Sequence, residues 1–134
     1  MANFDFLENI TELQPLYAHC REAENFQLVR PEQSVIGARK ALEYWVKLVY
    51  LTNGWDMPQH AGLMELVSNT DFIDYIGDAQ IMDNIHFIRR IGNQGAHGQK
   101  INKRESLHSL ACLHALVGEW LMLVGAIEDM PHFD

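Results

Sequence analysis

Apolar residues recur with the period of an α-helix along the whole chain. They stand three and four residues apart in each long stretch, and no stretch alternates apolar and polar residues as a half-buried strand would. A helix with one apolar face has to bury that face against a neighbour. The sequence therefore predicts an all-α fold, an up-and-down bundle of four to six helices.

Length and composition point to one domain spanning residues 1–134. With 134 residues, of which 48% are hydrophobic, the chain can bury its own core and leaves no room for a second domain. No basic and apolar signal peptide follows Met1, and no stretch approaches the roughly 20 apolar residues that a membrane span needs. We expect a cytoplasmic protein without a membrane partner. Cys20 and Cys112 stand singly among apolar neighbours, which predicts buried free thiols.

Proline and glycine mark the helices of the first half. An apolar stripe over residues 6–13 predicts an early helix, which Pro15 breaks or restarts. Pro31 suits the first turn of the next helix, and Asn53 followed by Gly54 suits its end. Because the stretch from Pro31 carries a wide apolar band, we expect it to form the central core helix.

Capping residues mark the helices of the second half. Residues 55–77 contain several Gly, Pro and Asn residues and predict a connector of short pieces, with a turn of helix at 63–67. Asp78 or a neighbour is expected to begin the next helix. Asn102, with Glu105 three residues later, resembles a capping box that begins the last one.

Basic residues concentrate in one segment of an acidic chain. The formal net charge is -8, yet residues 84–104 hold five of the ten Lys and Arg residues and none of the eighteen Asp and Glu residues. A phosphate-bearing partner would bind there. Lys100, Lys103 and Arg104 form a basic loop at the end of this segment, and we expect any contact with nucleic acid to use it.

Four polar side chains of this segment share one helical face. At about 100° per residue, His86, Arg90, Asn93 and His97 fall within a stripe of roughly 60°. The opposite face carries isoleucines and then small residues, among them Gly92. That glycine and the next either let a neighbouring helix approach closely or end the helix. We call the four residues the polar stripe.

The polar stripe is open to three interpretations. Arg90 and His97 are the residue types of a metal-free phosphodiester-cleaving pair, in which the imidazole takes a ribose hydroxyl proton and the guanidinium offsets phosphate charge. The stripe could instead form a structural network with Glu43 as the carboxylate partner of Arg90. The third interpretation is anion contact without chemistry, and the structural one is favoured from spacing alone.

The remaining histidines and cations predict no further site. The histidines lack the spacing of a metal site, so no metal is expected, and His108 should be half-buried while His114 lies at the surface. Arg39, Lys40 and Lys47 fit the solvated side of an amphipathic helix.

The run Ile-Arg-Arg-Ile-Gly-Asn-Gln-Gly-Ala-His at 88–97, followed by a basic loop and an apolar helix ending near Trp120-Leu121, resembles an N-terminal domain of type I restriction endonuclease R subunits. The run Ala-Arg-Lys-Ala-Leu-Glu at 38–43 resembles an earlier helix of that domain. The likeness covers nearly the whole chain, and its most specific part is Arg-x-x-Gly-Asn-x-x-x-His.

That domain is similar in turn to the HEPN superfamily of helical bundles, some of which are metal-free ribonucleases. Carried over, the ribonuclease pair would be Arg90 and His97. However, Ile91 replaces the polar residue that usually follows the arginine, and six residues separate the pair. The resemblance therefore implies a HEPN-like bundle without chemistry of its own.

The resemblance also implies what this chain belongs to. It would be the N-terminal part of a longer R subunit that combines a nuclease with an ATP- and Mg-dependent DNA translocase, with no cofactor in this domain. The implied partners are the other domains of that polypeptide, the methylation and specificity subunits, nucleic acid through the basic loop, and a second copy of the chain. A HEPN-type ribonuclease and a stand-alone partner-binding helical protein are the alternatives.

Overall fold

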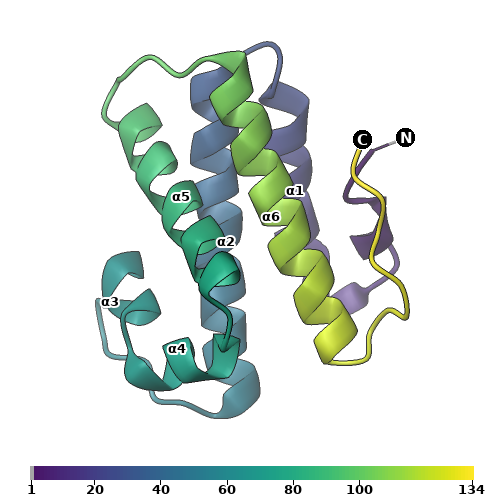
Figure 1. Ribbon diagram of the computed structural model, residues 1–134, viewed down its shortest axis with the longest axis vertical. Helices are drawn as coiled ribbons and strands as arrows, with labels where there is room; N and C mark the ends of the chain where they lie inside the picture. The colour runs from purple at the N-terminus through teal and green to yellow at the C-terminus, as the bar shows by residue number, and fades with distance from the viewer. Residues whose placement is uncertain (1) are drawn as a thin grey trace.

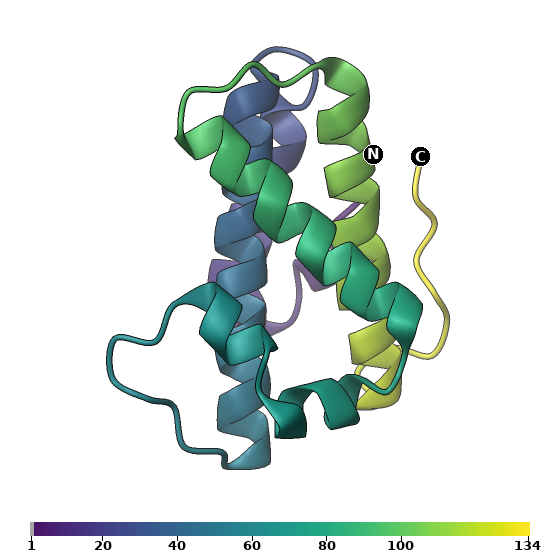
Figure 2. The same cartoon turned by 60° about the vertical axis from the view of Figure 1, so that its left-hand side comes forward.

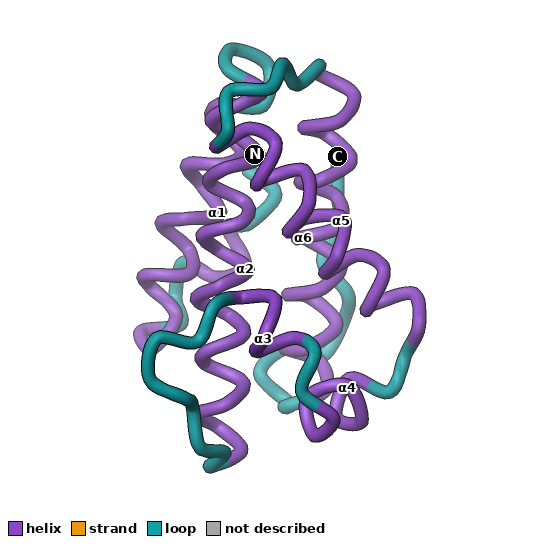
Figure 3. Tube along the Cα trace, turned by 90° about the vertical axis from the view of Figure 1, so that its left-hand side faces the viewer, coloured by secondary structure: helices purple, strands orange, loops and turns teal. Residues whose placement is uncertain are grey.

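The computed structural model describes residues 2–134, and Met1 lies outside the described residues. Helices and loops account for all of the described part, without a strand (Figure 3). The four long helices run alternately up and down the bundle (Figure 1). They are α1 Gln14–Phe26, α2 Pro31–Asn53, α5 Ala79–Ala96 and α6 Lys103–Leu123. The predicted all-α bundle of four to six helices is thereby confirmed.

Two short helices and two 3-10 turns complete the chain. The short helices, α3 Leu63–Val67 and α4 Thr70–Ile76, connect α2 to α5 at the lower end of the bundle (Figure 1). The 3-10 turns, η1 Asp5–Leu7 and η2 Thr11–Leu13, precede α1. The helix expected over residues 6–13 is therefore wrong in type. Each of the two turns covers three residues. Pro15 lies in the first turn of α1, which confirms the alternative that it starts a fresh helix.

Residues that favour helix ends lie where the helices end. Pro31 occupies the first turn of α2, and Gly54 closes that helix with a φ of 69°, which costs glycine no steric strain. Asp78 accepts hydrogen bonds from the first free N–H groups of α5. Asn102 and Glu105 form the reciprocal capping box of α6. These four predictions are confirmed.

The core lies around α2, which packs against the other three long helices. Its Trp45 is fully buried and meets Phe72 and Trp120 edge-to-face, with ring centroids 6.1 and 6.0 Å apart. Cys20 and Cys112 are buried free thiols, as predicted. α6 has the length and mean hydropathy of a membrane-spanning helix, but 61% of its apolar window is buried inside the bundle, which is the pattern of a core helix.

α5 crosses obliquely over α2 (Figure 2), and two glycines set the distance between them. A Cβ atom on Gly92 would lie 2.5 Å from the Cβ of Arg39 and 3.0 Å from the carbonyl oxygen of Val35. A Cβ atom on Gly95 would lie 2.7 Å from a methyl carbon of Val35. The glycines therefore permit close approach and do not end the helix, which continues to Ala96.

Segments from both ends of the chain cover one side of α6. The backbone N–H of Asp134 donates to the side-chain oxygen of Asn3 at 2.8 Å, and the two ends lie side by side in Figure 1. His114 of α6 faces these segments, and its ring contacts those of Phe4, Phe6 and Phe133 at centroid distances of 5.1 to 5.6 Å. His114 is only 2% exposed, so its predicted surface position is wrong. His108, predicted to be half-buried, is exposed because it lies on the outer side of α6.

Candidate functional site

α5 carries the polar stripe on its outer face. His86, Arg90 and Asn93 belong to the helix, and His97 ends it by donating its backbone N–H to the Asn93 carbonyl at 3.0 Å. Because the helix is continuous through Gly92, the angular relation among the four residues predicted from the sequence is retained. Arg90 and His97 are exposed, while His86 and Asn93 are half-buried.

No internal network holds the stripe. Within residues 2–134, none of its four side chains makes a hydrogen bond, and the single ion pair joins Lys47 Nζ to Glu43 Oε2 at 3.5 Å. The expected pair between Glu43 and Arg90 is therefore not formed. Lys47 stands one helical turn from Glu43 on α2, whereas Arg90 lies on the solvent side of α5.

Arg90 and His97 share a face but not a position along it. Seven residues of helix separate their Cα atoms by roughly 10 Å along the axis. Proton transfer needs the reacting groups within hydrogen-bond reach of one substrate. Both residues are exposed, and no hydrogen bond among the described residues directs either side chain toward the other.

Arginines from two helices meet beside the stripe. Arg39 of α2 lies over Gly92, so its side chain reaches the surface of α5 one turn beyond Arg89. Arg90 follows Arg89 on the same helix. The Nε atoms of Arg39 and Arg89 are buried without a hydrogen-bond partner. We call Arg39, Arg89 and Arg90 the arginine seam.

Burial and neighbouring charges lower the pKa values of Arg89 and His86. Burial lowers the pKa of Arg89, and the charges of Arg90 and Arg39 lower it further. Burial also lowers the pKa of His86, with Arg89 and Arg90 adding to the effect and Asp83 opposing it. Near neutral pH the imidazole of His86 is therefore uncharged beside the guanidinium groups.

Sequence reasoning missed two members of the seam. Arg39 was assigned to the solvated side of its helix, and Arg89 was assigned no role. The signal available was Gly92, three residues after Arg89, since a small residue there lets another helix place a long side chain against α5. Which helix would supply that side chain is a matter of tertiary packing.

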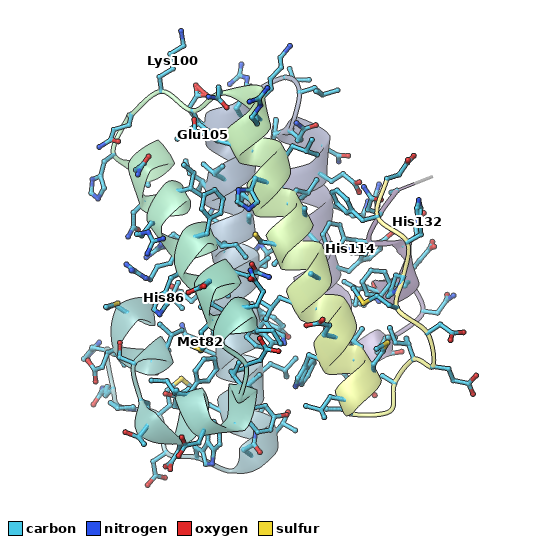
Figure 4. The ribbon with its side chains drawn as sticks, viewed as in Figure 1. Met82, His86, Lys100, Glu105, His114 and His132 are labelled. Carbon is cyan, nitrogen blue, oxygen red and sulfur yellow. The ribbon has the colours of Figure 1, made fainter. Side chains whose placement is uncertain are left out.

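The basic loop lies at the top of the bundle, away from the middle of the stripe. Figure 4 shows Lys100 projecting from the loop and His86 lower on α5. Lys103 and Arg104 begin α6, and all three cations are exposed. The carbonyl of Lys103 accepts a hydrogen bond from Gln27 Nε2 at 3.1 Å, which ties the start of α6 to the end of α1.

Two cavities lie away from the polar stripe. One of about 350 Å³ is lined mainly by aromatic and apolar side chains of α2, α4, α5 and α6, including Trp45 and Trp120. A second of about 270 Å³ lies between α1 and α2 and includes Glu43. Neither is lined by a residue of the polar stripe. Among residues 2–134, no three His, Cys, Asp or Glu side chains are grouped so that they could hold a metal ion.

No family model, curated protein or solved structure matches this chain significantly.

Proposed function

We propose that this chain is a noncatalytic interaction module of a type I restriction-modification endonuclease R subunit, and that it contacts its partner through the outer face of α5. The resemblance in residues 88–97 supports the parent enzyme. The observation that carries the contact role is the exposure of Arg90 and His97, each without an internal partner within the described residues. A guanidinium and an imidazole on the outer side of a continuous helix, without partners among residues 2–134, are available to an outside group.

The proposed setting follows from that parent. The module would act in the cytoplasm beside the nuclease and the ATP- and Mg-dependent translocase of its own polypeptide, together with the methylation and specificity subunits. ATP and Mg would bind to the parent and not to this domain. Reading the gene past codon 134 tests this setting: a frame that continues into nuclease and helicase sequence supports it, and a stop codon there favours a stand-alone partner-binding protein.

A metal-free ribonuclease is the second candidate, because Arg90 and His97 share one face of α5. Two copies of the chain could place both residue types around one phosphate. We expect this activity to be absent, since neither side chain is held in place by a hydrogen bond within the described residues and the pair spans two helical turns.

A cleavage assay with labelled single-stranded RNA in EDTA separates the two candidates. The wild type, Arg90→Ala, His97→Ala and the control His108→Ala, an exposed histidine on α6, are compared at equal concentration. We expect no cleavage above the level without protein. Cleavage by the wild type and the control that disappears in both Arg90→Ala and His97→Ala would overturn the noncatalytic assignment.

A further inference from the structure

The arginine seam is a concentration of positive charge that the fold does not neutralise. Within residues 2–134, no carboxylate lies within 4.0 Å of Arg39, Arg89 or Arg90. The nearest acids on the same helices are engaged or peripheral. Glu43, one turn after Arg39, pairs with Lys47, and Asp83 is exposed at the lower border of the seam.

Burial makes this arrangement costly for the protein alone. The Nε atoms of Arg39 and Arg89 are covered and make no hydrogen bond. A buried donor without an acceptor destabilises a fold, and more so when it is charged. Packing of the two helices brings like charges together here, in a chain whose eighteen acids could have supplied partners. An external anion held by the outer ends of the guanidinium groups would offset the like charges that meet here.

The anion that fits is extended. Cations lie at two places on this side of the bundle, the seam in the middle of α5 and the basic loop that follows the helix at Lys100 (Figure 4), and the α5 side chains between them, residues 91–96, carry no charge. The helix from Arg89 to Ala96 alone covers about 10 Å. One strand of a duplex presents a phosphate about every 3.4 Å of its axis. Several phosphates in a row match this length, whereas a single carboxylate or phosphate does not.

We propose that the arginine seam binds consecutive phosphates of a nucleic-acid backbone, duplex DNA in the first place, with the basic loop as a secondary contact. This inference rests on the contact role proposed above and names the partner and the residues. Arg39 and Arg89 keep their side-chain stems packed between α2 and α5 and direct their guanidinium ends to the phosphates. Guanidinium groups suit phosphate because they can donate two hydrogen bonds at once.

Binding of a fluorescein-labelled 20-base-pair duplex, followed by anisotropy over a salt series from 50 to 200 mM, tests the proposal. We expect Arg89→Gln and Arg90→Gln each to weaken binding several-fold and to lower the slope of log Kd against log salt by about one. Lys47→Gln is the matched control, because it removes one positive charge that is already paired with Glu43. It should leave the affinity and the slope nearly unchanged.

Thermal melting checks that each variant is folded. Arg90→Gln should disturb the fold least, because Arg90 is exposed. Equal binding of a single-stranded RNA of the same length also supports the proposal, because the seam contacts phosphates alone. The proposal is overturned if the wild type binds no nucleic acid at 50 mM salt, if the arginine variants behave as Lys47→Gln does, or if polyglutamate binds and the nucleic acids do not.

The failure of this inference is distinguishable from that of the proposed function. If the chain binds the duplex through the seam and also cleaves RNA, the noncatalytic assignment is wrong and the seam remains a phosphate-binding site. If the chain neither binds nucleic acid nor cleaves RNA, phosphate binding by the seam is wrong, and the proposed function remains as a module that contacts protein.

Discussion

The surroundings of His114 determine the protonation of its imidazole. Three phenylalanine rings surround it, it is 2% exposed, and its Nε2 atom is buried without a hydrogen-bond partner. Burial lowers the pKa of its imidazole, and the charge of His132 lowers it further, against a smaller opposing hydrogen bond. The neutral form is therefore the one that the folded chain accepts.

Acid is expected to weaken the fold through this residue. Because the pKa of folded His114 lies below the ordinary value of 6.5, the unfolded chain binds more protons, and the free energy of unfolding falls as the pH drops below about 6.5. His86, whose pKa is also lowered, acts with the same sign. Melting temperatures measured from pH 8 to pH 5 should decline over the acidic half of that range.

The variant His114→Phe identifies the source of the decline. Its melting temperature should fall less between pH 7 and pH 5 than that of the wild type, whatever its stability at neutral pH. His97→Gln, which replaces an exposed histidine, is the control and should follow the wild type. An unchanged decline in His114→Phe would assign the acid sensitivity to other groups.

At the scale of elements, the crossing of α2 and α5 depends on the absence of two side chains. The backbone of α5 approaches so closely at Gly92 that a single methyl group would meet the Cβ of Arg39, an atom that cannot move without its helix. The same closeness places Arg39 against α5. Both the helix crossing and the arginine seam therefore require a glycine at position 92.

Gly92→Ala is expected to destabilise the protein although alanine favours helix. The gain in helix propensity is about 1 kcal/mol, and overpacking at a contact of 2.5 Å costs more, for a net loss of about 1–2 kcal/mol. Urea unfolding followed by circular dichroism measures it. Gly62→Ala is the control, since a Cβ atom there meets nothing within 4 Å and φ is -79°. A Gly92→Ala variant as stable as the wild type would contradict the close packing.

Local chemistry made most helix ends predictable. Pro31, Gly54, Asp78 and Asn102 act through atoms within a few residues of themselves, so sequence alone locates them. The helix α4 was missed because the same kind of local signal was misinterpreted. Asn69 and the following Thr-Asp were interpreted as a break, whereas the Asn69 side chain accepts two backbone N–H bonds and begins a helix.

The candidate site was predictable only in part. The polar stripe follows from the period of one helix, so its four members could be named from sequence. The positions of Arg39, Glu43 and His114 depend on which helix packs beside them, and no spacing within one helix encodes that. The ion pair assigned to Glu43 and the exposure assigned to His114 were both wrong on this account.

At the scale of the molecule, one core unites all the helices, and its two thiols can report on it. Cys20 is fully buried in α1 and Cys112 is 6% exposed in α6. Burial raises the pKa of both thiols, that of Cys112 to about 11. The reactive thiolate is therefore scarce in the folded chain as well as covered.

Both cysteines are expected to resist Ellman's reagent at pH 8 until the bundle unfolds. In urea the two thiols should react together as the fraction of unfolded chain rises. Ser68→Cys, at an exposed position, should add one thiol that reacts at once without denaturant. Rapid reaction of a native cysteine would show that α1 or α6 opens independently of the rest.

The hydrogen bond between Asp134 and Asn3 holds the two ends of the described chain together, which allows other chain connectivities. A few residues of spacer would close the backbone into a ring without moving any helix, and the loop at 97–102 offers a place to cut it again. Because the chain enters and leaves the bundle at neighbouring points, the whole domain can also be inserted into a surface loop of a host protein through two short linkers.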